Sequence, residues 1–193
     1  ALIAVPVQFN LLLEDQYGIN DVIQAAGVSG LVEKITLRIT VLRGVDGTVH
    51  FVPNGQIVTV SNMTHGWSRA LFDIGVAYKE DVFKVMDVLV KLGRELRREP
   101  NFRHLILEDP EMLGVDRFED SAVVIRFFIK TRPLQQWTVR RAMLARIKTK
   151  FDELGIEIPF PHRTVYHRYP DRPDPDEIVA PGDAPPAGEE PRS

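Results

Sequence analysis

The sequence predicts an α+β protein made of two modules in series. Short alternating strand patterns separated by turn residues come first, and the order strand, helix, strand, strand, helix follows them. Such a separation is typical of α+β folds: the strands of the first module are collected together, and the hairpin of the second is flanked by helices. We expect an antiparallel β module at residues 14–66 and a ferredoxin-like α/β sandwich at residues 67–160.

The β module begins with a predicted strand at residues 21–25 and continues with a stretch at residues 32–42. In this stretch every second residue from Ile35 to Val41 is aliphatic, and the residues between them are polar. A period of two is typical of a strand with one buried and one solvated face. We therefore expect residues 32–42 to form one continuous strand.

Turn residues divide the rest of the β module. Asp46-Gly47 predicts a hairpin, because glycine adopts the positive φ that the reversal needs. A strand is expected at residues 48–52, a turn at Pro53-Asn54-Gly55 and a last strand at residues 56–61. Short antiparallel strands in this order favour a small β-barrel.

The α/β module opens with a predicted strand at residues 71–76 and an amphipathic helix. Asp81 can cap this helix, because its side chain can accept hydrogen bonds from the first free N–H groups. Apolar residues then recur at helical spacing from Val82 to Leu96, and Pro100 ends the helix.

A hairpin and a second helix complete the α/β module. Strands are expected at residues 112–118 and 121–131, and one face of the second carries Val123, Ile125, Phe127 and Ile129. The second helix is expected at Gln136–Leu154, since Gly155 can end it in the left-handed conformation. Its expected inward residues are Met143, Leu144, Ile147, Phe151 and Leu154. Residues 155–158 are a possible final strand.

The C-terminal part differs in composition. Pro159 and Pro161 impose an extended chain, and the β-branched and aromatic residues 164–169 then predict a short strand with no partner left in its own module. Such a strand either pairs with another chain or closes the sheet edge of its own subunit. Residues 170–193 hold seven of the fourteen prolines and a charge of −5, so we expect a disordered acidic tail.

Composition argues against several functional classes. The 193 residues are 44% hydrophobic, include no cysteine and carry a net charge of −3, which leaves +2 on residues 1–169. A nearly neutral folded part lacks the basic field that supports non-specific nucleic-acid binding. The absence of cysteine rules out disulfides and fits a cytoplasmic location. The longest apolar runs are far shorter than the roughly 18–20 residues that cross a bilayer, so this chain alone is not expected to span a membrane.

No motif predicts an enzyme. The five histidines lack the spacing of metal ligands, and the neighbouring carboxylates of Glu14-Asp15 and Asp109-Pro110-Glu111 are best explained as solvated charges in turns. Phosphate-binding and nucleophile loops are absent. We therefore assign no catalytic, cofactor-binding or metal-binding residue. The arginines of the second helix are interpreted as a solvated face.

Four stretches, in order along the chain, carry a resemblance to a known family. They are LEDQYGINDVI at Leu13–Ile23, GLVEKI at Gly30–Ile35, LRGVDGTVHFVPNGQI at Leu42–Ile57 and IPFPHRTVY at Ile158–Tyr166. On these stretches the chain resembles the soluble region of MscS-type small-conductance mechanosensitive ion channels, from about Leu13 to Tyr169. The resemblance implies a homoheptamer in which each subunit contributes an Sm-like β domain, an α/β domain and a C-terminal strand.

The resemblance also implies roles for particular residues. The C-terminal strand would close a seven-stranded parallel barrel through Thr164, Val165, Tyr166, His167, Arg168 and Tyr169. A turn on the membrane side would couple the pore helices to the cage through Asp46, Gly47, Phe51 and Pro53. Residues 1–13 would then be the remnant or linker of a pore-lining helix that this chain lacks, since Pro6 interrupts their apolar run.

The function implied by this resemblance is that of a cytoplasmic cage beneath a tension-gated pore in the plasma (inner) membrane. Ions and small solutes would pass through gaps between subunits, and opening would release solutes during osmotic downshock. The expected partners are other copies of the chain and, through the missing helices, the membrane. No cofactor and no nucleic acid are expected.

Two other functions remain open at this point. A small barrel followed by a ferredoxin-like sandwich uses two folds that often bind RNA, although Phe127 and Phe128 are expected on opposite faces of their strand rather than as a paired aromatic platform. The second alternative is a soluble oligomeric scaffold that binds a partner through its acidic tail.

Overall fold

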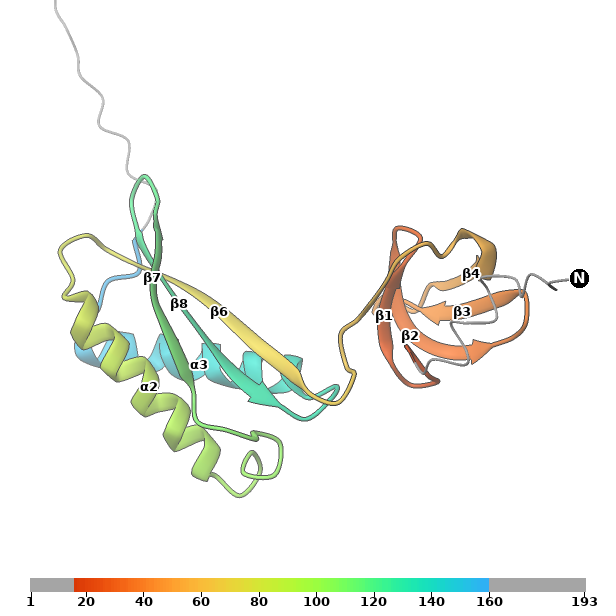
Figure 1. The fold of residues 1–193 in the computed structure, drawn as a ribbon. Helices are drawn as coiled ribbons and strands as arrows, with labels where there is room; N and C mark the ends of the chain where they lie inside the picture. The colour runs from red at the N-terminus through yellow and green to blue at the C-terminus, as the bar shows by residue number, and fades with distance from the viewer. Residues whose placement is uncertain (1–15, 160–193) are drawn as a thin grey trace, which may run out of the picture. The chain divides into compact units, whose positions relative to one another are not determined.

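The computed structural model of the chain describes residues 16–159, and over this range it is a mixed α+β structure. Two antiparallel sheets are present, with strand orders β4-β3-β2-β1-β5 and β6-β8-β7 (Figure 1). Each sheet has its own cluster of buried apolar residues. The predictions for residues 1–13, for the strand at 164–169 and for the tail at 170–193 lie outside the described residues.

The five-stranded sheet consists of β1 (Val22–Ala25), β2 (Val28–Ile35), β3 (Ile39–Arg43), β4 (Val49–Pro53) and β5 (Val60–Asn62). The strands curl around a small core made of Tyr17, Ile23, Ala25, Val32, Leu42, Val52 and Ile57. The Asp46-Gly47 hairpin is confirmed, because β3 and β4 pair in antiparallel register on either side of it.

The expectation of one strand over residues 32–42 was wrong. The chain reverses at residues 36–38, and β2 and β3 pair with each other on either side of this turn. The Thr36 hydroxyl stabilises the turn by accepting from the Ile39 N–H at 3.1 Å and donating to the Ile39 carbonyl at 3.0 Å. A threonine that satisfies backbone groups locally favours a turn over a continuous strand. Leu37 consequently lies at the tip of the turn with 68% of its surface exposed.

The strand expected at residues 56–61 is also mostly absent. A 3₁₀ turn at Asn54–Gln56 takes its place, and only β5 remains as strand. The buried Asn54 side chain fixes this turn, since it donates to the Thr36 carbonyl at 2.8 Å and accepts from the Thr40 hydroxyl at 2.9 Å. The Thr40 hydroxyl lies 3.1 Å from that of Tyr17. One asparagine therefore joins three segments of the five-stranded sheet.

Gly30 is required by close contact between two backbones. A Cβ atom added at Gly30 would lie 2.6 Å from the carbonyl oxygen of Arg43 in the neighbouring strand. No real Cβ contact is that short, so only glycine permits the observed pairing of β2 with β3 at this position.

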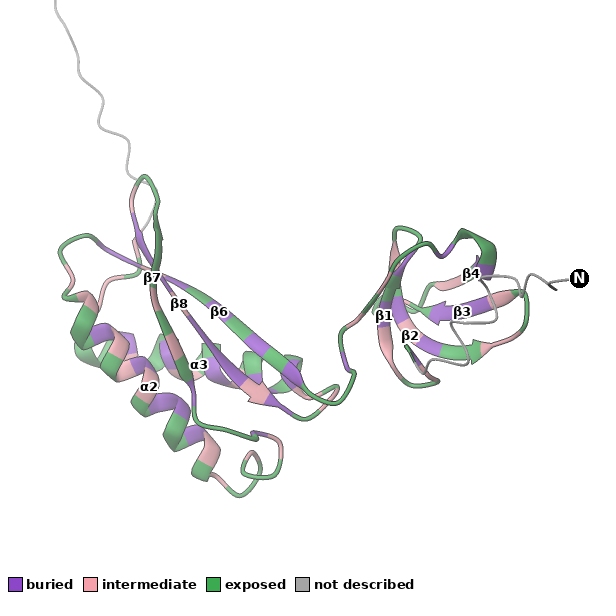
Figure 2. Cartoon of the chain, viewed as in Figure 1, coloured by how far each residue is buried: buried purple, intermediate pink, exposed green. Residues whose placement is uncertain are grey.

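The three-stranded sheet consists of β6 (Ser68–Val76), β7 (Glu111–Phe118) and β8 (Val123–Thr131), and one face is covered by helices α2 (Val82–Arg98) and α3 (Gln136–Leu154). The buried stripes of both helices appear in Figure 2. Asp81 caps α2 as expected, accepting from the N–H groups of Phe83 and Lys84 at 3.0 and 3.3 Å. Gly155 ends α3 with φ +68°.

Strand β8 is central and pairs with both β6 and β7, which confirms the expected hairpin with β7. The predicted inward residues Val123, Ile125, Phe127 and Ile129 all belong to the core. The ring of Phe127 stacks on that of Phe72, with centroids 4.6 Å apart. The alternation of β8 thus identified its buried face correctly.

Two expectations for α3 and the residues after it were wrong. Leu144 and Leu154 were expected to face inward, but 39% and 50% of their surfaces are exposed. Residues 155–158 form no strand, although the Ala77 N–H donates to the Glu157 carbonyl at 3.1 Å. The backbone of these residues instead completes the end of α3, because the Ile156 N–H donates to the Phe151 carbonyl at 2.9 Å.

Replacing Asn54 with alanine is expected to lower the free energy of unfolding by about 2 kcal/mol, because buried partners lose both a donor and an acceptor. Urea unfolding followed by circular dichroism would measure the loss. Asn101→Ala is the matched control: Asn101 is exposed and its side chain makes no hydrogen bond within residues 16–159, so its effect should stay within about 0.5 kcal/mol. Equal effects of the two substitutions would contradict the structural role of Asn54.

Candidate functional sites

The four residues expected to face the membrane all belong to the β3–β4 hairpin, but Pro53 lies at the end of β4 that is away from the turn. Asp46 and Gly47 form the turn, Phe51 lies within β4, and Pro53 ends β4. Because β4 is an edge strand, the missing N–H of Pro53 costs the sheet nothing on its open side. The sequence therefore predicted which hairpin carries these residues, and their coupling role stays a prediction.

Hydrogen bonds hold the turn in one conformation. The Asp46 carboxylate accepts from the Thr48 N–H at 3.0 Å and from the Thr48 hydroxyl at 2.7 Å. These bonds, the hydroxyl first, lower the pKa of Asp46. Gly47 has φ +87°, which an L-residue rarely adopts. Its carbonyl accepts from Arg43 at 3.1 Å, and Arg43 also pairs with Glu33.

The turn and β4 expose apolar side chains beside these polar contacts. Val45 is fully exposed at the turn, and 68% of the Phe51 surface is exposed. A rigid hairpin with two exposed apolar side chains is suited to contact with another apolar surface, since burying them would stabilise an interface.

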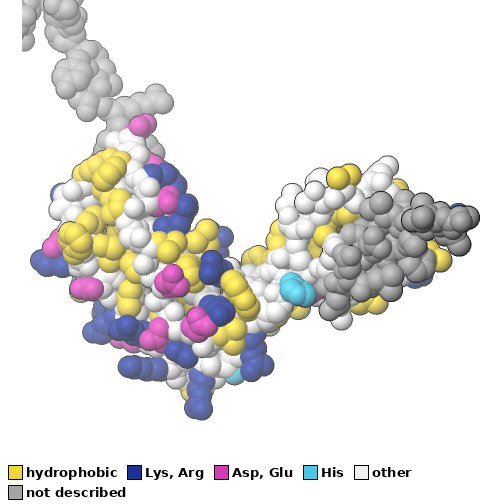
Figure 3. Space-filling model, in the orientation of Figure 1, with side chains coloured by type: hydrophobic (Ala, Val, Ile, Leu, Met, Phe, Trp, Pro, Cys, Tyr) yellow, Lys and Arg dark blue, Asp and Glu magenta, His cyan; other side chains and the backbone are white. Residues whose placement is uncertain are grey.

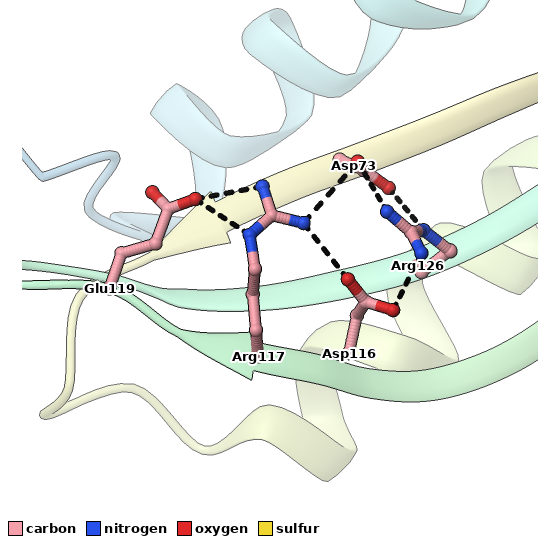
Figure 4. A network of polar contacts seen from close by, with 5 residues as sticks. All are labelled: Asp73, Asp116, Arg117, Glu119 and Arg126. Atoms are coloured by element: carbon pink, nitrogen blue, oxygen red, sulfur yellow. Dashed lines mark hydrogen bonds and ion pairs between the residues drawn. The ribbon is translucent and has the colours of Figure 1, made fainter.

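A second candidate site covers the face of the three-stranded sheet that is opposite to the helices. We call it the charged sheet face and define it by the basic residues Arg69, Arg117, Arg126 and Lys130 and the acidic residues Asp73, Glu108, Asp116 and Glu119. Figure 4 shows five of them in one network. Arg126 of β8 holds Asp73 of β6 through two bonds of 2.6 and 2.8 Å, and Asp116 of β7 through one of 2.7 Å.

Arg117 extends this network along β7. Its guanidinium lies 2.9 Å from Asp116, 3.5 Å from Asp73 and 2.8 Å from Glu119. The pKa of Asp73 is lowered, mainly by its hydrogen bonds to Arg126; partial burial opposes this shift. All three strands therefore contribute charges that neutralise one another.

Aromatic rings support the basic residues at the other end of this face. The Arg69 guanidinium lies 4.1 Å from the ring centroid of Phe128 and 5.0 Å from that of Trp67. Lys130 is 5.0 Å from the Trp67 ring and pairs with Glu108 at 2.5 Å. Phe128 is consequently 6% exposed although no helix covers it.

Sequence reasoning missed the charged sheet face. Asp73 and Arg126 are directly opposite in the pairing of β6 with β8, but they are 53 residues apart in the sequence. The available signal was the charged residues alternating with apolar ones along each strand, which mark a solvated face without revealing which charges meet.

The two sites offer exposed apolar side chains and balanced charge. The charged sheet face has four basic and four acidic side chains, so its field is short-ranged. Within residues 16–159 no three His, Cys, Asp or Glu side chains converge on a possible metal position. Neither of the described helices has the length and apolarity that a bilayer crossing requires.

Comparison with protein families gives two matches in series. The family described as "Mechanosensitive ion channel, beta-domain" matches residues 9–65, and "Mechanosensitive ion channel MscS, C-terminal" matches residues 70–158. Together they cover both helices and all the strands except the first two residues of β6.

Proteins that are similar to this chain in sequence are also named mechanosensitive channels. The chain is 36% identical over 157 residues to a small-conductance mechanosensitive channel of Caldanaerobacter subterraneus subsp. tengcongensis, covering 81% of this chain and 55% of that protein. It is 28% identical over 151 residues to the moderate conductance mechanosensitive channel YbiO of Escherichia coli, covering 77% and 20%. The chain thus spans about half of the first relative and a fifth of the second.

Solved structures share the fold. Helicobacter pylori MscS in a closed state gives a TM-score of 0.67 at 21% identity, over 84% of this chain and 63% of that one. Arabidopsis thaliana MSL1 gives 0.55 at 16% identity, over 80% and 57%.

Replacing Arg126 with glutamine is expected to raise the pKa of Asp73 towards its ordinary value of 3.8. A carboxylate with a depressed pKa stabilises the fold above the unfolded-state pKa, and that stabilisation disappears as pH falls through the folded-state pKa. Stability should therefore drop less steeply below about pH 4 in the variant. Carboxyl-carbon NMR titration and unfolding at pH 3 and 6 would measure both effects.

Arg132→Gln is the control for this experiment, because Arg132 is exposed and its side chain pairs with no carboxylate within residues 16–159. The ion-pair network would be rejected if Asp73 titrated alike in Arg126→Gln and in the unmodified chain.

Proposed function

The chain belongs to the MscS family of mechanosensitive ion channels, and we propose that it forms the cytoplasmic cage beneath a pore that opens under membrane tension. The two family matches, at residues 9–65 and 70–158, carry this proposal. In the parent protein, the pore and the tension sensor would come from parts of the channel that this sequence does not include. Opening would release ions and small solutes during osmotic downshock.

The domain organisation proposed for the cage has five parts. Residues 14–66 form an Sm-like domain, which the curled five-stranded sheet supports, and residues 67–160 form a ferredoxin-like domain. Supporting the second assignment, α2 follows β6, α3 follows β8, and the strand order β6-β8-β7 is that of a split β-α-β fold without its fourth strand. Residues 1–13 are a linker, 161–169 a barrel strand and 170–193 a tail.

The proposed assembly is a homoheptamer in the plasma (inner) membrane, with this chain on the cytoplasmic side. Residues 164–169 of seven subunits would pair into a parallel barrel, which would give the strand predicted from their sequence a pairing partner. The β3–β4 turn would contact the pore helices through Phe51, whose exposed ring is suited to burial in an interface.

The charged sheet face fits a vestibule that ions cross without strong selection. Its ion pairs have distances of 2.5–3.5 Å, so an ion nearby meets dipoles rather than a field of one sign. A wall of this kind neither traps nor excludes solutes by charge. We propose that the chain has no enzymatic activity, as expected for a channel family.

The RNA-binding alternative is less well supported. A stacking platform needs exposed rings, whereas Phe127 is in the core and the ring of Phe128 is covered by Arg69. The scaffold alternative differs from a channel cage only in lacking a membrane pore, so patch-clamp recording from the parent protein under suction decides between them.

Light scattering coupled to size exclusion should give a mass near seven subunits for this chain and a smaller mass after removal of residues 162–193. The physical reason is that the barrel strand supplies hydrogen bonds that close the ring. A chain of the same mass with and without these residues would contradict closure by the strand. Removal of residues 180–193 alone is the control, since it leaves the strand intact.

Replacing Phe51 with serine in the parent channel should raise the tension at which suction opens it. The lost apolar contact is worth about 1–2 kcal/mol, or roughly a tenfold change in the closed–open equilibrium at fixed tension. Val58→Ser is the control, because Val58 is 93% exposed and lies outside the coupling turn. Patch-clamp thresholds that shift equally in both variants would contradict the coupling role of Phe51.

A further inference from the structure

A group of arginines at the end of α2 differs from the charged sheet face. Arg94, Arg97, Arg98 and Arg103 surround an open hollow of about 450 Å³ with Asp109 as the single acidic residue. We call this hollow the arginine pocket. Basic side chains gather in the lower part of the α/β region in Figure 3, where α2 ends in Figure 1.

One carboxylate serves two of these arginines. Asp109 lies 2.5 Å from Arg97 and 3.4 Å from Arg94, and Arg97 also donates to the Leu107 carbonyl at 3.0 Å. Hydrogen bonding to Arg97 is the main reason that the pKa of Asp109 is lowered. Arg98 and Arg103 are exposed, and neither pairs with a carboxylate within residues 16–159. Four guanidinium groups and one carboxylate leave a local charge of +3.

Helix electrostatics account for part of this charge only. Basic residues are favourable in the last turn of a helix, which fits Arg97 and Arg98. Arg103 lies beyond the end of α2, and Arg94 precedes its last turn. By comparison, Arg146 beside the same helix end is paired with Glu99 at 2.6 Å. The arginine pocket therefore has capacity for an acidic group that the described residues do not supply.

We propose that the acidic tail of the same chain, residues 170–193, docks in the arginine pocket. The tail has seven carboxylates and two arginines, hence a charge of −5, and its first acidic residues are Asp171, Asp174, Asp176 and Glu177. Arginine binds carboxylates through two parallel hydrogen bonds, which makes it the side chain suited to such a segment. Seven prolines restrict the tail to extended conformations, so less entropy is lost on docking.

The length of the chain permits this contact. Glu157 is fixed beside the start of α2, where its N–H donates to Glu80 at 3.2 Å and its carboxylate pairs with Lys79 at 2.5 Å. The 17 residues of α2 extend for about 25 Å from there to the arginine pocket. Residues 159–171 can bridge up to about 40 Å when extended. The first carboxylates of the tail can therefore reach the arginines of their own subunit.

Docking by exposed charges depends on ionic strength. The Debye length falls from about 10 Å at 0.1 M salt to about 3 Å at 1 M. The tail should therefore be bound at low salt and released at high salt. Docking of the tail requires neither the pore nor a particular number of subunits, so it does not depend on the proposed function.

The absence of cysteine makes a direct distance measurement possible. Spin labels on Asn101→Cys, next to the arginine pocket, and on Ala184→Cys, in the tail, report docking in the full chain by double electron–electron resonance. Dilution with a tenfold excess of unlabelled chain restricts the signal to pairs within one subunit. A narrow short-distance population is expected at 0.05 M salt and should be lost at 1 M.

Charge reversal tests where the tail binds. Arg98→Glu with Arg103→Glu should reduce the short-distance population at least tenfold at low salt; neither side chain has a hydrogen bond or ion pair within residues 16–159. Arg140→Glu with Arg141→Glu changes the net charge equally at exposed α3 positions without described partners and should leave docking intact. Circular dichroism checks that both variants fold.

Three results would overturn the proposal. The first is an equal loss of the short-distance population in both double variants, which would indicate attraction to net charge alone. The second is a short-distance population that persists at 1 M salt. The third is retention of docking when all seven carboxylates of residues 170–193 are neutralised, each aspartate to asparagine and each glutamate to glutamine.

Discussion

The fold around α2 and α3 depends on burying both faces of one central strand with a helix layer on only one side. The inner face of β8 packs against the helices in the usual way. The outer face also carries apolar residues, and Val124 and Phe128 are only 3% and 6% exposed. The guanidinium of Arg69 covers the ring of Phe128, at 4.1 Å from its centroid. Long basic side chains can bury apolar surface while their charges stay in water.

The charged sheet face is a network rather than a set of isolated ions. Arg126 of the central strand is held from both sides, because carboxylates on the two neighbouring strands pair with it. A single exposed ion pair contributes little to stability. A pair whose two side chains are already positioned by neighbouring strands loses less side-chain entropy when it forms. A surface that is well packed and electrically balanced follows from the same contacts.

Hydrophobic periodicity predicted β8, α2 and the β7–β8 hairpin because each buries one continuous face. It failed at residues 36–38 and 54–56, where buried polar groups decide the chain path. Asn54 and Tyr17 meet through Thr40 although they are far apart in sequence, and no local pattern marks such partners. The Asp46-Gly47 turn was predictable because its chemistry is local. The charged sheet face could not be predicted without the register of the strands. The arginine pocket could not be predicted without knowing where α2 ends.

Tail docking in the arginine pocket and barrel closure by residues 164–169 are proposed for neighbouring parts of the C-terminal segment. If residues 164–169 close a barrel, the tail starts from that barrel, and its 24 residues still extend up to about 80 Å. Barrel closure relies on backbone hydrogen bonds, which salt hardly affects, whereas docking relies on exposed charges, which salt screens. The two contacts can therefore coexist and be separated by ionic strength. A fall in ionic strength would therefore strengthen docking of the tail without weakening barrel closure.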